Sequence, residues 1–257
     1  MEHTTDTSAA SSEPSPARRA DRARNVAEVL RQQAAAGLYP TGFLPDERLL
    51  SKDFAVSRNT VRQALLILRD EGLVERRRGV GTVLLNRKHS HPLERLAGLA
   101  ETLKSHGTVD NEVRARGTVV PPAQVARRLS VPDGEPVVRL ERLRRLDGRP
   151  LSLDLTYLPA DIGLPLLDLD LENQDVFALI EQSCGQRLGA AEVTVQAVNA
   201  DPHTARILAA PVGTALFAVE RLSRLADGRP VDLEFLSVRG DRLTLQADLH
   251  RTGTATG

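Results

Sequence analysis

Apolar residues recur at helical spacing within residues 46–72. They form two short apolar faces separated by a turn, and these faces consist of Leu49, Leu50, Phe54, Val61, Leu65 and Leu68. Asp46 and Ser57 each precede one face, where a side-chain oxygen can accept the unpaired N–H groups of a first helical turn. Gly72 stands where a helix-ending glycine is expected. The pattern predicts two helices joined by a tight turn.

The first turn of the second predicted helix is rich in hydrogen-bonding side chains, namely Ser57, Arg58, Asn59, Thr60, Arg62 and Gln63. A recognition helix presents such residues to DNA, where Arg can bind guanine, Asn can bind adenine, and hydroxyl groups can bind phosphates. A basic hairpin containing Arg78 and Gly79 follows, in the position of a wing that lies along the minor groove. The alternative is a solvated amphipathic helix followed by an ordinary surface hairpin.

Residues 44–82 (LPDERLLSKDFAVSRNTVRQALLILRDEGLVERRRGVGT) resemble the winged helix-turn-helix of GntR-family bacterial transcription regulators. Such regulators bind operator DNA as dimers, so the resemblance implies double-stranded operator DNA and a second copy of the chain as partners. Together, the resemblance and the side-chain chemistry give these candidate DNA-binding residues: Arg48, Ser57, Arg58, Asn59, Thr60, Arg62, Arg78 and Gly79.

A second pattern is an internal repeat of a β-hairpin. Residues 137–158 read VVRLERLRRLDGRPLSLDLTYL and residues 216–238 read LFAVERLSRLADGRPVDLEFLSV. Each copy has an Asp-Gly pair, at Asp147 and at Asp227, which favours the positive φ angles of a tight hairpin turn. Short helices are expected at 122–129, 175–182 and 202–208, with strands at 113–120 and 193–197. We therefore predict an α+β domain, an antiparallel sheet with helices packed on one side.

The paired hairpins resemble the UTRA effector-binding domain of the HutC branch of the GntR family, over about residues 93–251. Arg142 and Arg144 alternate onto one strand face, as a guanidinium pair for a phosphate or carboxylate. They could instead pair with acidic residues such as Asp154 across the hairpin. By resemblance, the effector pocket uses these arginines and acidic residues matching Asp154 and Glu234.

One departure concerns the ligand. Branches that sense sugar phosphates commonly have a Ser-x-Tyr pattern where this chain has Asp175-Val176-Phe177. An aspartate would repel a phosphate, and Phe cannot donate a hydrogen bond. We expect a polar effector, anionic or zwitterionic, although a cationic metabolite also fits. The candidate effector-binding residues are Arg142, Arg144, Asp154, Phe177 and Glu234.

The predicted organisation has four parts: a disordered tail (1–20), a winged helix-turn-helix domain (21–86), a linker (87–92) and a UTRA effector-binding and dimerisation domain (93–251). The linker histidines, His89 and His91, are expected to be solvated, because no further metal ligands lie at suitable spacing. An amphipathic helix is expected at 93–106.

Charge and composition agree with a DNA-binding protein. The net charge is zero, but residues 18–88 hold 15 Lys and Arg against 8 Asp and Glu, which favours phosphate binding at one end of the chain. A single cysteine, Cys184, excludes an internal disulfide. No apolar run reaches the ~18 residues of a membrane span and no signal peptide is evident, so we expect a cytoplasmic bacterial protein bound to the nucleoid.

These features predict an effector-controlled, homodimeric repressor without metal or cofactor. The alternative class is an enzyme, since the UTRA fold resembles that of chorismate lyase. No catalytic Ser-His-Asp or Cys-His order, zinc-protease motif or phosphate-binding loop is recognisable, so no catalytic residues are predicted.

Overall fold

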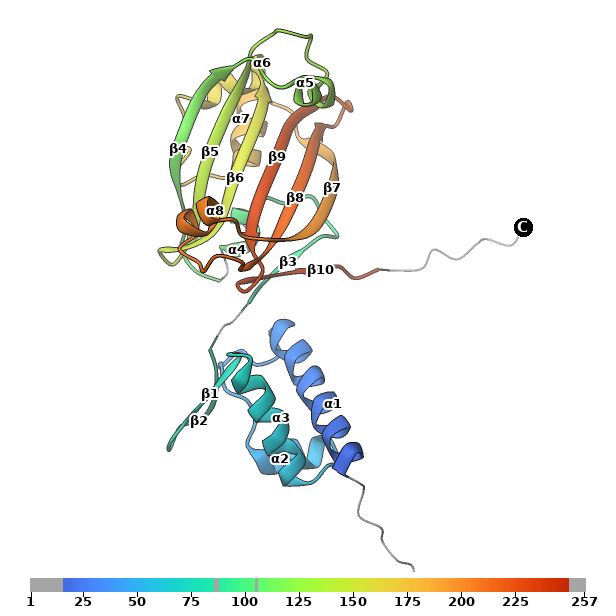
Figure 1. The fold of residues 1–257 in the computed structure, drawn as a ribbon. Helices are drawn as coiled ribbons and strands as arrows, with labels where there is room; N and C mark the ends of the chain where they lie inside the picture. The colour runs from blue at the N-terminus through green and yellow to red at the C-terminus, as the bar shows by residue number, and fades with distance from the viewer. Residues whose placement is uncertain (1–15, 86–87, 105, 250–257) are drawn as a thin grey trace, which may run out of the picture. The chain divides into compact units, whose positions relative to one another are not determined.

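The structure, a computed structural model, describes residues 16–85, 88–104 and 106–249. The chain divides between residues 87 and 88 into two parts, which we call the N-terminal unit and the C-terminal unit (Figure 1).

The N-terminal unit contains the predicted helix pair and wing. Its elements are α1 (Pro16–Ala35), α2 (Glu47–Asp53), α3 (Arg58–Asp70), β1 (Val74–Arg77) and β2 (Gly81–Leu84). The Asp46 carboxylate accepts from the Leu49 N–H at 2.7 Å, and the Ser57 hydroxyl accepts from the Thr60 N–H at 3.2 Å. Both predicted N-caps are therefore confirmed.

Side chains from all three helices and from β1 pack into one apolar core, formed by Val26, Ala27, Leu30, Leu44, Leu50, Val61, Ala64, Leu68 and Val74. Leu49 was expected in this core but is exposed, because Leu50 takes the inward position. The boundary of the predicted tail was also wrong. Helix α1 begins at Pro16, so residues 16–20 are helical, and residues 1–15 lie outside the described residues.

The C-terminal unit is built on a six-stranded antiparallel sheet with the order β4-β5-β6-β9-β8-β7. Its strands are β4 (Val109–Val119), β5 (Val137–Leu146), β6 (Arg149–Pro159), β7 (Leu188–Asn199), β8 (Ala215–Leu225) and β9 (Pro230–Arg239). The repeated segments form the hairpins β5–β6 and β8–β9, and β6 pairs with β9 to place the two repeats side by side at the centre of the sheet. Asp147 and Gly148 have φ angles of 51° and 71°, as the predicted tight turn requires.

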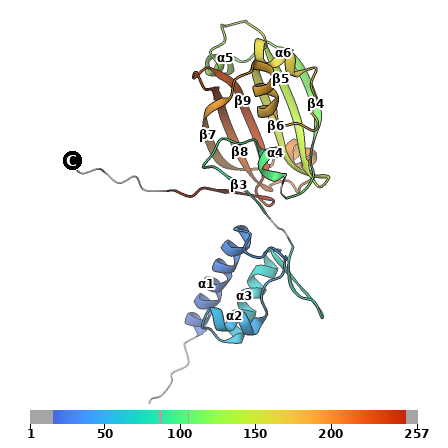
Figure 2. The same cartoon turned by 180° about the vertical axis from the view of Figure 1, so that it is seen from behind.

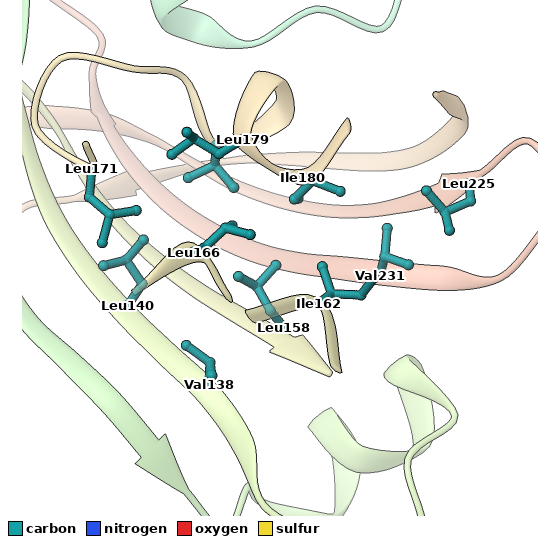
Figure 3. Close-up of a cluster of buried hydrophobic side chains, with 11 residues drawn as sticks. Val138, Leu140, Leu158, Ile162, Leu166, Leu171, Leu179, Ile180, Leu225 and Val231 are labelled. Atoms are coloured by element: carbon teal, nitrogen blue, oxygen red, sulfur yellow. The ribbon is translucent and has the colours of Figure 1, made fainter. Parts of the chain in front are cut away.

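Helices cover both faces of this sheet. Helices α4 (Leu99–Leu103), α6 (Ala160–Leu166) and α7 (Val176–Cys184) lie on one face, and α5 (Ala123–Leu129) and α8 (Pro202–Ile207) lie on the other (Figures 1 and 2). The prediction that helices pack on one side only was wrong. Successive residues of a strand point to opposite faces of the sheet, and here both faces carry apolar side chains that helices cover. Val138 packs with α6 and α7 (Figure 3), whereas Val137 packs with α5.

The start of the C-terminal unit also differs from the prediction. Residues 89–92, assigned to a linker, form strand β3 (His89–Pro92), which pairs in parallel with β10 (Leu243–Gln246). A helix was expected at 93–106, but the only helix in this range of the described residues is the shorter α4 (Leu99–Leu103). His91 was expected to be solvated but is only 7 % exposed. It lies in β3, which is covered because β10, from the other end of the chain, pairs with it. Residues 86 and 87, just before this segment, lie outside the described residues.

The α7 packing provides a test of this core. Leu179 is fully buried in the cluster of Figure 3. We expect Leu179→Ala to lower the free energy of unfolding of the C-terminal unit by about 2–5 kcal/mol, because the substitution leaves a cavity. The matched control, Leu164→Ala in α6, removes a 47 % exposed side chain and should change stability by less than about 0.5 kcal/mol. Guanidinium unfolding followed by circular dichroism measures both, and equal losses would contradict this packing.

Candidate functional site

The first candidate site is the exposed surface around the N-terminus of α3. Five of the predicted DNA-binding side chains are exposed, namely those of Arg48, Ser57, Arg58, Asn59 and Arg62, and the wing adds exposed Arg78 and Gly79. Thr60 differs, since it is 5 % exposed. Its hydroxyl lies 2.9 Å from that of Ser57. Thr60 therefore helps to fix the start of α3.

Glu47 connects α3 to the β1–β2 hairpin. Its carboxylate lies 2.7 Å from Arg62 Nε of α3 and 3.0 Å from Arg76 Nη1 of β1. The Glu47 side chain is 18 % exposed, whereas those of the two arginines are 59 % and 73 % exposed. One carboxylate thus orients two cationic side chains on the same surface while leaving both accessible to a phosphate.

The second candidate site is a group of buried polar side chains in the C-terminal unit. It lies on the sheet face that α4, α6 and α7 cover. We call it the polar cluster; it consists of Arg142, Arg144, Ser152, Asp154, Thr156, Arg221, Ser223, Asp232 and Glu234 of the sheet, each at most 8 % exposed, together with Asp175, the N-cap of α7. Strand register creates the cluster, because Arg142 pairs with Asp154 and Thr156 pairs with Glu234 across neighbouring strands.

The arginines of the cluster have different partners. Arg144 Nη2 lies 2.8 Å from Asp154 Oδ2. Arg221 Nε donates to Glu234 Oε2 at 2.8 Å, and its guanidinium carbon lies 4.4 Å from the centre of the Phe177 ring. Arg142 Nη1 instead donates to the carbonyl oxygens of Leu171 and Gln174 at 3.3 and 3.4 Å. The cross-hairpin pairing considered from the sequence therefore holds for Arg144.

The predicted effector residues lie close together, and the structure adds others. Arg221, Asp232 and Asp175 were not predicted as effector residues. Arg221 could have been predicted from the repeat, because Glu220-Arg221-Leu222 occupies the position in the second hairpin that Glu141-Arg142-Leu143 occupies in the first. The same alignment relates Asp154 to Glu234, so the two hairpins supply equivalent carboxylates, although the arginine paired with Asp154 is Arg144 and not Arg142.

Several polar atoms of the cluster have no hydrogen-bond partner among the described residues. They are Arg142 Nε and Nη2, Arg144 Nη1, Ser152 Oγ, Thr156 Oγ1, Asp154 Oδ1 and Asp232 Oδ1. A buried polar group without a partner costs about 1–3 kcal/mol. Such a concentration of donors and acceptors is expected where a bound polar molecule completes the hydrogen bonds.

The ionisation of the cluster reflects burial and mutual interaction. Burial and the neighbouring Glu234 raise the pKa of the Asp232 carboxyl well above its usual range, although Arg221 opposes them. Burial also acts to raise the pKa of Asp175, but Arg144, the Phe177 N–H and Arg142 outweigh it and hold that pKa below its usual range. Asp175 is consequently an anion at neutral pH, whereas the raised pKa of Asp232 makes this carboxyl easier to protonate than an ordinary aspartate.

A cleft of about 330 Å³ adjoins the polar cluster. Residues 91–97 and strands β7 to β10 line it, mainly with apolar side chains, and Arg221 belongs to both the cleft and the cluster. In the part of the chain that the structure describes, no helix is long and apolar enough to cross a membrane, and no group of three or more His, Cys, Asp or Glu could hold a metal ion.

Comparisons with known proteins cover both units. The family of bacterial regulatory proteins named gntR matches residues 22–84, and the UTRA domain matches residues 104–244. The chain is 30 % identical to the HTH-type transcriptional regulator Rv0792c of Mycobacterium tuberculosis over 90 % of this chain and 87 % of that one.

The chain is also 32 % identical to the HTH-type transcriptional repressor PhnF of Mycolicibacterium smegmatis, over 82 % of this chain and 86 % of that one. The crystal structure of PhnF from Mycobacterium smegmatis superposes with a TM-score of 0.65 at 30 % identity, covering 88 % of this chain and all of that one.

The protonation of the buried His91 ring can be measured directly. Burial, together with Arg221 and Arg144, lowers the pKa of His91 to about 4, although Asp175 opposes this shift. Because an unfolded histidine has a pKa of about 6.5, its contribution to stability should be complete above pH 6.5 and lost as the pH falls towards 4. NMR titration of the imidazole protons, assigned with His91→Gln, should give a midpoint near 4. A midpoint near 6.5 would contradict the burial of this ring.

The Thr156 hydroxyl, which has no hydrogen-bond partner among the described residues, gives a second test. Thr156→Val keeps the side-chain shape and removes the buried hydroxyl, so we expect an unchanged or higher Tm. Thr204→Val is the matched control, because the Thr204 hydroxyl donates to Asp201 Oδ2, and its loss should lower stability by about 0.5–1.5 kcal/mol. Scanning calorimetry compares the two. A similar decrease in both variants would show that Thr156 already has a partner.

Proposed function

Because this chain belongs to the gntR family of bacterial regulatory proteins and carries a UTRA domain, we propose that it is a homodimeric repressor whose operator affinity is set by a polar small molecule bound at the polar cluster. It is a DNA-binding transcription regulator, as are the relatives it resembles over most of its length. The observation that carries the proposal is that one chain combines the exposed cationic first turn of a capped α3 with a buried site, in the C-terminal unit, whose polar atoms lack partners among the described residues.

Helix α3 enters the major groove with its N-terminus first. Arg58 and Asn59, exposed in the first turn, read base edges, because Arg suits guanine and Asn suits adenine. The exposed Arg48, Ser57, Arg62, Arg78 and Gly79 contact the phosphate backbone or the minor groove. Arg62 exchanges its ion pair with Glu47 for a phosphate, and Thr60 holds the helix start in place rather than touching DNA.

A single α3 can read only one short half-site. Helix-turn-helix proteins gain affinity by binding two half-sites one turn of DNA apart with a two-fold dimer. We therefore assign a homodimer and an inverted-repeat operator to this chain.

The effector occupies the polar cluster. Arg142, Arg144 and Asp154 offer hydrogen-bonding atoms that have no partner among the described residues. Glu234 orients Arg221, and Arg221 lies over the Phe177 ring, which forms an apolar wall. The adjoining cleft, which shares Arg221, gives a route from solvent.

Ligand binding is coupled to DNA through residues 91–102. Two contacts join this segment to the cluster: Arg221 Nη1 donates to the Ala97 carbonyl at 3.3 Å, and the Ala100 N–H donates to Asp175 at 3.2 Å. Within the segment, His91 Nδ1 lies 2.8 Å from the Thr102 hydroxyl. The segment lies at the start of the C-terminal unit, and any change in it reaches the chain that leads to the DNA-binding unit. Ligand and operator then alter each other's affinity by the same factor.

We assign no catalytic role to the chain, and we place it in the bacterial cytoplasm on the nucleoid. Within the described residues of the cluster, Ser223 contacts the Asp232 carboxylate, and the nearby His91 contacts Thr102. Neither arrangement joins a hydroxyl nucleophile to a histidine base held by a carboxylate, as nucleophilic catalysis requires.

Operator binding tests the assignment of α3. An operator is first selected from a random duplex library, and affinity is then measured by fluorescence anisotropy at fixed salt. Arg58→Ala should weaken operator binding by about 1–3 kcal/mol and relax the sequence preference at one position. Arg69→Ala, at the opposite end of the same helix, removes an equal charge and is the matched control. Equal effects of the two variants, or full sequence-specific binding by Arg58→Ala, would contradict the proposed role of α3.

A further inference from the structure

Asp175 is the only carboxylate of the polar cluster that comes from a helix start rather than from the sheet. Its Oδ1 accepts from the Phe177 N–H at 3.0 Å, and its Oδ2 accepts from the Ala100 N–H at 3.2 Å. It thus bridges α7 and α4. Its negative charge is attracted by the positive charges of Arg144, Arg142 and Arg221, and these arginines lower the pKa of Asp175 although burial acts to raise it.

The surrounding chain leaves space for this carboxylate. A Cβ atom on Gly98 would lie 2.2 Å from both Asp175 oxygens, a distance that side chains do not adopt. Gly98 precedes α4 with an ordinary φ of −67°, so backbone conformation does not require glycine here. The absence of a side chain at residue 98 is explained by the position of the Asp175 carboxylate.

The charges of the cluster are already balanced without a bound anion. Its arginines are Arg142, Arg144 and Arg221, and its carboxyl groups are Asp154, Asp175, Asp232 and Glu234. Fully ionised, these groups sum to one negative charge, and a proton on Asp232 would make the cluster neutral. A phosphate or carboxylate from a ligand would therefore add an uncompensated negative charge to a buried region, which costs several kcal/mol.

The unpartnered atoms indicate what a ligand should offer instead. Asp154 Oδ1 is an acceptor, Asp232 Oδ1 is an acceptor when ionised and a donor when protonated, and the hydroxyl groups of Ser152 and Thr156 can accept or donate. The two unpartnered nitrogens of the fully buried Arg142 need neutral acceptors, such as hydroxyl oxygens. Hydroxyl and amino groups satisfy this combination without adding negative charge.

We infer that Asp175 is the built-in anion of the effector site, and that the effector is an uncharged or cationic molecule rich in hydroxyl or amino groups. It presents no phosphate or carboxylate to Arg142 and Arg144. This inference rests on the proposed function and narrows the effector class, replacing the anionic or zwitterionic molecule expected from the sequence.

Inorganic phosphate is the probe, and the full chain is used throughout. Wild type should show no saturable rise of Tm with phosphate beyond that in sodium chloride of equal ionic strength. Asp175→Ser keeps an N-cap hydroxyl but vacates the anion position. This variant should gain a saturable rise of about 2–4 °C, which is lost when Arg142→Gln is added.

Asp201→Ser is the matched control. Asp201 caps α8 through the His203 and Thr204 N–H groups, as Asp175 caps α7, but it lies outside the polar cluster. It should gain no response to phosphate. If Asp175→Ser does not fold, Asp175→Asn, which keeps a capping oxygen and removes the charge, is expected to show the same gain.

Two outcomes would overturn the inference. One is a saturable phosphate response of wild type that Arg142→Gln abolishes, because the arginines would then accept an external anion beside Asp175. The other is no response in the folded Asp175 variant. Operator binding of the wild type is measured in parallel. Retained operator binding with either outcome would reject the ligand class alone, whereas loss of sequence-specific binding would reject the proposed function.

Discussion

Burial of ionised side chains on one sheet face is the constraint on which the C-terminal unit depends. Removing an ion from water costs several kcal/mol unless a partner of opposite charge and further hydrogen bonds replace the water. Each of the two hairpins supplies one buried ion pair, Arg144 with Asp154 in one and Arg221 with Glu234 in the other. Asp175 completes it from α7 and, through Ala100, holds α4 against the same face. Asp175 therefore adds polar contacts to the apolar packing that holds both helices on this face.

The need to partner buried polar groups also allows the site to respond to a bound molecule. A buried group of donors and acceptors with incomplete hydrogen bonds is stable enough to fold, yet it gains free energy from a molecule that completes them. We propose that this gain reaches the DNA-binding unit through residues 91–102, because Arg221 and Asp175, both members of the cluster, each contact that segment. A ligand can shift operator affinity only by its differential affinity for two arrangements of the chain. The contacts of this segment are where such a difference can arise.

Local signals in the sequence predicted the parts of the fold that local chemistry determines. The caps Asp46 and Ser57, and the Asp-Gly turns, act within a few residues, so their helices and hairpins were confirmed. Strand β3 was missed because its partner β10 lies at the other end of the chain, and burial of His91 follows from that pairing. Arg221 could have been predicted as a site residue from its equivalence to Arg142 in the repeat. The role of Asp175 depends on Gly98 and Ala100, which only the tertiary structure brings to it.

The most direct test of the account is the effect of a cluster ligand on operator affinity. A thermal-shift screen of polyols, amines, amino acids, organic acids and sugar phosphates identifies compounds that stabilise the wild type, and Ser152→Ala shows which of them bind at the cluster. Anisotropy titrations with the selected operator are then repeated with such a compound at saturation. The account predicts a change in operator Kd of about 5–150-fold that is lost in Ser152→Ala. A compound that binds at the cluster and leaves the operator Kd unchanged would contradict it.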